Sequence, residues 1–268
     1  MIIGFVLYNE GSDFSERIRL VASLGCHIYI FDNSPESEYS RMFLNADAFT
    51  NISYFTAGSN IGLARAMSML CAQAYYCGHR TLFFLDQDTH ITNDALMFVI
   101  KLSNEFDFAR YSALSISNCK VRKENDSLLD HQSVVNNVKL VRNSGTLFNL
   151  KCLSQLNWFD SSYFVDGVDY QFSLNSCLNG FSIGMIDNVS GFDHWSGQGY
   201  TEHVLFGISI VDREYPISRI LDVTMSSLKL MFKSLTNWKF DYFAIFAKNL
   251  FVFLSFQLIL RLSSEVKS

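Results

Sequence analysis

The sequence predicts an α/β fold in which helices flank a mostly parallel sheet, followed by a helical extension at the C-terminal end. The first observation is that short apolar runs of strand length alternate with segments of helical periodicity through the first half of the chain. Parallel strands need crossover connections, so this alternation is typical of a sheet with helices on both faces. The second observation is that residues 213–268 contain only helical patterns. We therefore expect a sheet domain over residues 1–212 and an amphipathic helical region over residues 213–268.

The first half supplies four strands and the helices between them. Ser, Thr, Asp or Asn side chains stand where two of these helices would begin, and Gly25 and Gly78 stand where two would end. In chain order we expect strands over Ile2–Leu7, His27–Phe31, Ile52–Phe55 and Thr81–Leu85, and helices from Ser12 or Asp13 to Leu24, from Ile61 to Tyr76, and from Thr92 or Asn93 to Leu102.

The second half is less regular. We expect strands over Tyr111–Ile116, Val138–Leu150 and Phe181–Ile186, a polar loop over Lys120–Asn137, and helices over Lys151–Leu156, Tyr170–Leu178, Ile217–Leu235 and Phe240–Leu262. The last helix is very apolar, but its uninterrupted apolar run is shorter than the roughly 20 residues of a membrane span. Lysines and an arginine make the region basic, which suits a membrane interface. The alternative is packing on the domain or on a partner subunit, as in a homodimer.

Composition restricts the classes of partner. The chain has 268 residues, of which 49% are hydrophobic and 15% aromatic, so it is folded rather than disordered. Its formal net charge of −5 argues against broad nucleic-acid binding. The six cysteines are scattered and form no CxxC pair, which suggests reduced thiols in a cytoplasmic protein. The first apolar run is too short for a secretory signal, so we expect none.

Two carboxylates follow the Thr81–Leu85 strand with one residue between them, in Asp86-Gln87-Asp88. An aspartate is costly to bury unpaired, and two repel each other unless a cation or water lies between them. Oxygen ligands suit Mg²⁺ or Mn²⁺, so the pair predicts a metal site at the carboxyl end of a strand. Asp32 also follows a strand, and ligands of parallel sheets bind beyond these ends. The alternative for each aspartate is a turn residue.

The motifs along the chain have a recognisable order. They are Asp32-Asn33-Ser34, Asn60-Ile61-Gly62, Asp86-Gln87-Asp88, Ser144-Gly145-Thr146, Trp158-Phe159-Asp160, Phe164-Val165-Asp166-Gly167-Val168-Asp169, Asn179-Gly180 and His194-Trp195-Ser196-Gly197. This order and spacing resemble the family 2 glycosyltransferases, and within them the bacterial rhamnosyltransferase-type enzymes that build surface polysaccharides. The resemblance covers residues 2–200.

The resemblance implies a GT-A fold, a Rossmann-like sheet that binds a nucleotide-diphospho-sugar together with Mn²⁺ or Mg²⁺. Asp32 would accept a hydrogen bond from the nucleobase. Asp86 and Asp88 would hold the metal and His194 would complete its site, although a lone histidine can equally be structural. Trp195 would stack on the acceptor sugar or pack in the core. The other implied donor-site residues are Tyr8, Asn9, Asn60, Gly62, Gln87 and Gly145.

The resemblance also implies a carboxylate base that takes the proton from the acceptor hydroxyl. The Asp-x-x-Asp spacing offers Asp166 as the first choice and Asp169 as the second. Asp169 could instead cap the helix that we expect to begin at Tyr170.

These implications lead to one functional hypothesis. It is an inverting, metal-dependent transfer of a sugar, with rhamnose favoured, from a dTDP- or UDP-linked donor to a lipid-linked glycan at the cytoplasmic face of a bacterial inner membrane. A UDP-hexose or galactofuranose donor is the alternative within the class. The alternatives outside it are a sugar-nucleotide nucleotidyltransferase and a non-catalytic glycan-binding assembly subunit.

Overall fold

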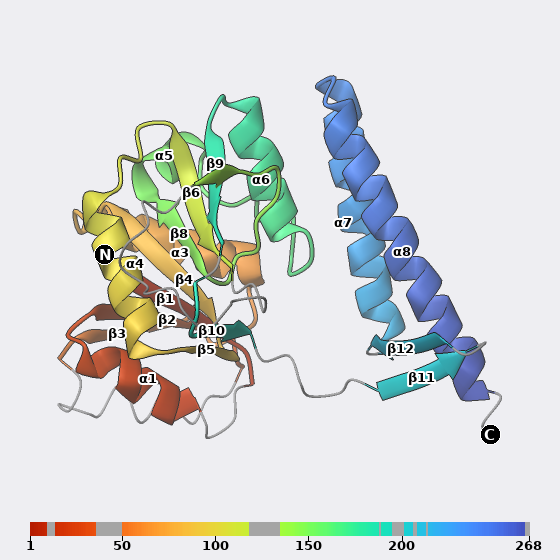
Figure 1. Cartoon of the computed structure of the whole chain (residues 1–268), viewed down its shortest axis with the longest axis horizontal. Helices are drawn as coiled ribbons and strands as arrows, with labels where there is room; N and C mark the ends of the chain where they lie inside the picture. Colours follow the sequence, from red (N-terminus) through yellow and green to blue (C-terminus); the bar gives the residue numbers. More distant parts are fainter. Residues whose placement is uncertain are drawn as a thin grey trace, which may run out of the picture. The chain divides into compact units, whose positions relative to one another are not determined.

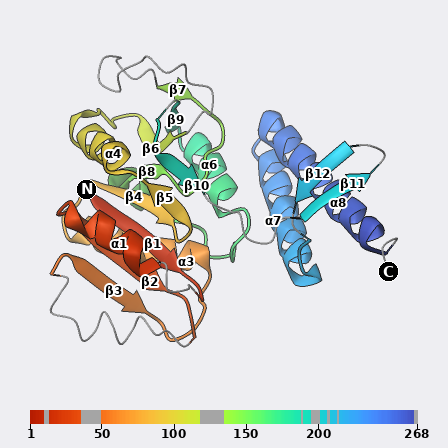
Figure 2. The same ribbon diagram turned by 60° about the horizontal axis from the view of Figure 1, so that its bottom comes forward.

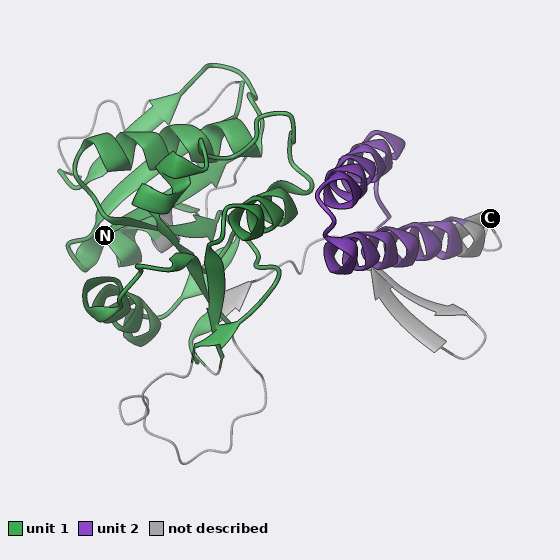
Figure 3. Cartoon of the chain, turned by 90° about the horizontal axis from the view of Figure 1, so that it is seen from above, with its two compact units in different colours: residues 1–195 green, residues 196–268 purple. Residues whose placement is uncertain are grey.

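The computed structural model describes residues 1–9, 14–35, 50–117, 135–187, 189–194, 201–205, 208–212 and 214–265. Ser12, Asp13, Trp195 and most of the expected polar loop lie outside these residues. The chain forms two compact units, residues 1–195 and residues 196–268 (Figure 3). The sequence analysis placed the boundary later, after residue 212.

The first unit contains an eight-stranded sheet in the order β3-β2-β1-β4-β8-β6-β9-β7 (Figure 1). Its strands are β1 (Ile2–Leu7), β2 (His27–Asp32), β3 (Ile52–Thr56), β4 (Thr81–Asp86), β6 (Tyr111–Ile116), β7 (Asn136–Asn137), β8 (Thr146–Asn149) and β9 (Ser182–Ile186). Strands β3, β2, β1 and β4 are parallel neighbours, and β8 runs antiparallel to both β4 and β6. The predicted α/β fold with a mostly parallel sheet is confirmed.

Helices cover both faces of this sheet (Figures 1 and 2). Helices α1 (Phe14–Ser23) and α4 (Asn93–Glu105) pack on the face formed by Ile3, Phe5 and Leu7 of β1. Helices α3 (Leu63–Tyr76), α5 (Leu150–Gln155) and α6 (Val168–Leu178) pack on the other face. All six residues of β1 are therefore buried, which explains why its sequence is a continuous apolar run.

Two parts of the first unit differ from the prediction. The expected Val138–Leu150 strand is wrong in extent, because β8 begins only at Thr146. Gly145 precedes it with a φ of +75°, a left-handed conformation that interrupts an extended chain. The short strands β5 (Thr89–Ile91) and β10 (Phe192–His194) were not expected, and they pair antiparallel outside the main sheet.

The second unit consists of the β11 (Thr201–Leu205) and β12 (Ile208–Asp212) hairpin and the helices α7 (Ile217–Thr236) and α8 (Phe240–Glu265). Helix α8 departs from the expected amphipathic helix, because apolar residues surround it on all sides. The sequence analysis took its uninterrupted apolar run as shorter than a membrane span. By length and composition alone, however, residues 240–261 are enough to cross a membrane, with an 18-residue window of mean hydropathy 1.9.

Candidate active site

The carboxyl ends of three adjacent strands bring the predicted nucleotide-binding residues to one edge of the sheet. Leu7, the last residue of β1, pairs with Asp32 of β2, and Val6 pairs with Asp86 of β4. Adjacent strands lie about 4.8 Å apart, so the two aspartates flank β1 at a separation of about 10 Å. Asp32 and Asp86 are thus placed as two ends of one site across the tip of β1.

A buried serine fixes the turn that carries Asp86 and Asp88. The Ser144 Oγ accepts a hydrogen bond from the Asp86 amide at 3.0 Å and shares another with the Thr89 Oγ1 at 2.7 Å. Ser144 is only 7% exposed. It therefore holds both ends of the Asp86–Thr89 turn, a role that its place in a small-residue segment did not reveal.

Gln87, between the two aspartates, binds the backbone of Tyr8. The Tyr8 amide donates to Gln87 Oε1 at 2.8 Å, and Gln87 Nε2 donates to the Tyr8 carbonyl at 3.3 Å. The backbone pairing of β1 and β4 ends at Val6 and Asp86, so this side chain continues it beyond the strands. Gln87 thus ties the turn to the backbone of Tyr8, an exposed residue that the sequence analysis expected in the donor site.

Asp32 is fully buried, and the structure gives each of its carboxylate oxygens a donor. The Ser34 amide donates to Oδ1 at 2.8 Å, and the Tyr54 hydroxyl donates to Oδ2 at 2.6 Å. The Asn9 amide in turn donates to Ser34 Oγ at 2.8 Å. Each carboxylate oxygen can accept a second hydrogen bond, so these contacts orient Asp32 without filling its capacity as an acceptor. Tyr54 was not predicted; it lies on β3, the neighbouring strand.

The start of helix α3 supports the loop that carries Asp166. The Leu63 amide donates to the Phe164 carbonyl at 2.6 Å, and Gly62 has a φ of +86°. A Cβ at Gly62 would lie 2.8 Å from the Phe164 ring and 2.9 Å from the Phe164 carbonyl oxygen. Asn60 Oδ1 accepts from the Gly62 amide at 2.9 Å and shapes the turn before the helix. Gly62 thus lies against the loop that carries Asp166, and its carbonyl accepts from Asn33 Nδ2 at 3.3 Å, next to Asp32.

Asp169 follows Asp166 in the chain and interacts electrostatically with both Asp166 and Asp86. The pKa of Asp169 is raised to about 6, mainly by burial and to a smaller extent by the negative charges of Asp86 and Asp166, while hydrogen bonds from backbone amides oppose the shift. The alternative role of Asp169 as a helix cap is wrong, because α6 begins at Val168 and Gly167 is its N-cap residue. Asp169 lies in the first helical turn, where Oδ1 accepts from the Tyr170 amide at 2.9 Å.

The backbone of His194 lies beside the same turn. In the β5–β10 pair, His194 is opposite Thr89, the residue after Asp88. Phe192 of β10 packs over Gly145, where an added Cβ would lie 2.4 Å from the ring, and both residues are buried. Gly145 thus gives room to Phe192. The side chain of His194 and all of Trp195 lie outside the described residues.

The carboxylates at this edge of the sheet are suitable ligands for a divalent cation. Asp86 and Asp88 supply the oxygen ligands that Mg²⁺ and Mn²⁺ prefer, and the charge of Asp86 acts on the Asp169 carboxyl. Among the described side chains, no group of three or more His, Cys, Asp or Glu residues is arranged to hold a metal.

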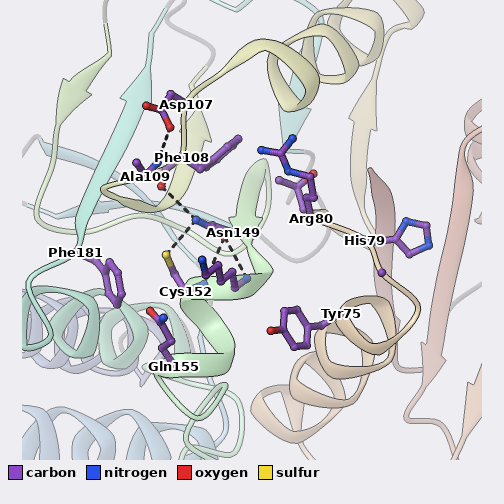
Figure 4. Close-up of a pocket in the computed structure, with 13 residues that line it drawn as sticks. Tyr75, His79, Arg80, Asp107, Phe108, Ala109, Asn149, Cys152, Gln155 and Phe181 are labelled. Atoms are coloured by element: carbon purple, nitrogen blue, oxygen red, sulfur yellow. Dashed lines mark hydrogen bonds between the residues drawn. The ribbon is translucent and has the colours of Figure 1, made fainter.

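A separate pocket of about 640 Å³ lies near the opposite end of β4, where Thr81 is one of its lining residues. In Figure 4, Asn149 lies beside Cys152, and its amide nitrogen donates to the Phe108 carbonyl at 3.3 Å. Six strand residues from Thr81 to Asp86 span about 17 Å, so this pocket is not part of the carboxylate site. None of the predicted site residues lines it.

Comparisons of structure show which fold the chain has. It is similar to S. aureus TarS (13% identity, TM-score 0.52, covering 86% of this chain and 39% of that one). It is also similar to TarS 1–349 in complex with UDP-GlcNAc (14%, 0.53, covering 86% and 66%). A third is the mannosyltransferase PcManGT from Pyrobaculum calidifontis in complex with GDP-Man and Mn²⁺ (14%, 0.52, covering 74% and 57%).

This similarity at low identity shows the GT-A fold predicted from the sequence. The chain spans 39% to 66% of the length of these structures. No protein-family model and no curated protein matches the sequence.

Proposed function

We propose that this protein is a glycosyltransferase that uses a nucleotide-diphospho-sugar. The observation that carries the proposal is the arrangement at the sheet edge, where Asp32 and Asp86 flank the tip of β1 and Asp169 lies close to Asp86. The proteins of similar fold include one in complex with UDP-GlcNAc and one with GDP-Man and Mn²⁺, which supports a donor of this class.

The donor lies across the tip of β1 in this proposal. Asp32 accepts a hydrogen bond from the nucleobase, and the diphosphate lies toward Asp86 and Asp88. The separation of about 10 Å between the flanking strands suits a nucleoside diphosphate that extends from one to the other. Tyr8 lies between these ends, held by Gln87. Asn9, Asn60, Gly62 and Gly145 shape the surrounding backbone.

Asp86 and Asp88, with His194, are the residues that would hold Mn²⁺ or Mg²⁺. When bound, the ion would stabilise the negative charge of the departing nucleoside diphosphate as a Lewis acid. The backbone of this turn is held by hydrogen bonds of Ser144, Thr89 and Gln87, so the two carboxylates would need little reorganisation to bind a cation.

The transfer proceeds with inversion in this proposal. A carboxylate takes the proton of an acceptor hydroxyl, the hydroxyl oxygen forms a bond to the anomeric carbon, and the bond from that carbon to the diphosphate oxygen breaks. The electron pair leaves with the nucleoside diphosphate. The Asp-x-x-Asp spacing favours Asp166 as the base. The pKa of about 6 favours Asp169, because a base works best with a pKa near the operating pH.

The finer assignment is a rhamnosyl donor and a lipid-linked glycan acceptor at the cytoplasmic face of a bacterial inner membrane. The resemblance of the motifs supports this assignment. A dTDP-linked donor distinguishes it from the alternatives that use UDP-hexose or UDP-galactofuranose.

Calorimetric titration with dTDP, UDP and GDP, each with and without Mn²⁺, tests the donor class. We expect one nucleotide to bind, to depend on Mn²⁺, and to lose that dependence in Asp88→Ala. Failure of all three nucleotides to bind would refute the proposal. Hydrolysis of the sugar donor without acceptor would separate an enzyme from a glycan-binding subunit.

Asp166→Asn and Asp169→Asn test the base. We expect the variant that lacks the base to bind donor normally and to lose transfer by about 10²–10⁴-fold. Normal transfer in both variants would show that neither carboxylate is the base.

A further inference from the structure

Helix α7 carries a stripe of exposed apolar side chains. The stripe consists of Ile217, Leu221, Met225, Leu228, Phe232 and Leu235, which are 41–70% exposed. Their spacing of three or four residues places them on one face of the helix. Ser226, Leu230 and Ser234 are buried and occupy the face about half a turn away, where α7 packs on α8. The stripe therefore points away from α8.

Helix α8 is apolar on its outer side as well. Its buried residues Tyr242, Phe246, Gln257 and Leu260 lie on one face, and Phe251, Leu254 and Leu258 are exposed on the other. Only 17% of its most apolar 18-residue window is buried. A helix that is apolar all round is normally enclosed by protein or by lipid. The contact with α7 covers only one side of α8 and does not enclose it.

The two apolar surfaces lie on different helices, and each lies away from the buried face of its own helix. A second copy that packed on the α7 stripe would leave Phe251, Leu254 and Leu258 uncovered, whereas lipid can surround both helices. The charges of α7, at Arg219, Asp222, Lys229 and Lys233, lie away from the stripe, which prevents α7 from spanning a bilayer and favours a position in the interface.

The connection between the helices has residues that are typical of a membrane interface. Trp238 is 79% exposed and contacts Phe240 edge-to-face, with ring centroids 5.8 Å apart. Lys233, Lys239 and Lys248 lie within ten positions of it. Tryptophan is enriched at the level of lipid head groups, and lysines there attract anionic lipids.

We propose that the α7–α8 hairpin is a membrane-contact element that inserts the α7 stripe and the outer face of α8 into a bilayer with anionic lipids. The proposal goes beyond the sugar-transfer function and does not depend on which donor the first unit binds. It assigns the exposed apolar surface of the second unit to lipid rather than to a second copy of the chain.

Co-sedimentation of the full chain with vesicles of phosphatidylcholine and phosphatidylglycerol tests this proposal. Leu228→Glu/Phe232→Glu places two charges in the stripe, and Ser218→Glu/Thr236→Glu places the same two charges on exposed positions of α7 outside it. We expect the stripe variant to lose at least about 10-fold in partitioning relative to this matched control, because it loses apolar burial and not only charge. Binding should persist in about 1 M salt, where the Debye length is only about 3 Å.

Trp238 supplies a second readout. We expect its fluorescence to shift to the blue on addition of vesicles, and the shift to be absent in Trp238→Phe. Equal binding by the stripe variant and the control would overturn the proposal, and so would failure of the unmodified chain to bind vesicles. A dimer in solution that the stripe variant dissociates, without vesicle binding, would assign the stripe to a second copy. Nucleotide titration of the stripe variant should give the same affinity as the unmodified chain, which would show that the substitutions act on vesicle binding and not on the donor site.

Discussion

At the scale of single residues, the site depends on side chains that hold other groups in place. Ser144 and Gln87 fix the Asp86–Asp88 turn from two sides, and Tyr54 orients Asp32. Each contact joins residues far apart in the sequence. The aspartates could be predicted because strand ends and spacing are visible in the sequence. Their supports could not, because a polar residue on a neighbouring strand has no local signature.

Gln87→Ala tests one of these supports. The change removes both hydrogen bonds to Tyr8, so we expect the KM for the donor to rise roughly 5- to 30-fold, as for the loss of 1–2 kcal/mol, with a smaller change in kcat. Steady-state kinetics with varied donor measure the split. Gln73→Ala, at an exposed glutamine of α3, is the matched control and should be neutral. An unchanged KM in Gln87→Ala would show that Tyr8 does not need this support.

Asp169→Asn tests the electrostatics of the carboxylate group. Burial raises the pKa of Asp169 in the folded protein to about 6 from its ordinary 3.8, so the folded state favours the protonated form. The carboxyl is neutral at low pH, and its ionisation costs stability as the pH rises through about 6. We therefore expect the variant to gain roughly 1–3 kcal/mol near pH 8 without metal, and little near pH 4.

Denaturant unfolding at the two pH values measures this gain. The exposed carboxylate of Asp94, at the start of α4, provides the control Asp94→Asn, which should show no such gain. Equal effects of Asp169→Asn at both pH values would show that the folded protein does not raise the pKa of the Asp169 carboxyl.

At the scale of elements, the start of α3 links the sheet edge beside Asp32 to the loop that carries Asp166. The helix itself was predicted from its periodicity and its glycines. Its contact with Phe164 was not, because a loop of exposed aromatic residues and carboxylates gives no indication of where it docks. The wrong extent of the Val138–Leu150 strand has a similar cause, since the turn that ends at Gly145 is fixed by Phe192 of β10 and by the Asp86 amide of β4, which are distant in the sequence.

Gly62→Ala tests the link between α3 and the loop. Both Gly62 and Gly78, at opposite ends of α3, have φ near +85°, at +86° and +84°. A Cβ at Gly62 would meet the Phe164 carbonyl oxygen at 2.9 Å, whereas nothing lies within 4 Å of a Cβ at Gly78. We expect both alanine variants to lose roughly 1 kcal/mol of stability from the left-handed conformation.

Only Gly62→Ala should also lower kcat, because it displaces the loop that carries Asp166. Thermal unfolding and turnover of the two variants measure the two effects separately. A similar kcat in both variants would show that transfer does not depend on this docking.

At the scale of the whole molecule, the sequence predicted the class of fold and the edge where the site lies. The alternation of elements is a property of the chain itself, and parallel sheets bind ligands at the carboxyl ends of their strands. The pairing of β5 with β10, which brings His194 beside Thr89, depends on the folded first unit. It could not be inferred from two short segments about a hundred residues apart.

Ligand binding should stabilise the first unit if the site is as proposed. We expect Mn²⁺ together with the cognate nucleoside diphosphate to raise the Tm, by an amount that corresponds to about 2.7 kcal/mol at a 100-fold excess over Kd. Thermal scans with ligand, with ligand and EDTA, and with Asp88→Ala measure the effect. An equal rise in Tm with EDTA present would show that the nucleotide binds without the metal.

The position of β8 between β4 and β6 affects how the protein is made. Strand β4 ends at Asp86 and its partner β8 ends at Asn149, so 63 further residues (149 − 86) must be synthesised before the β4 edge can be paired. At ribosomal rates of about 5–20 residues per second, this interval lasts roughly 3–13 s. During it, the nascent chain exposes the backbone edge beside Phe83 and Phe84, which are fully buried in the finished fold. That edge is where a chaperone bound to the emerging chain would prevent aggregation.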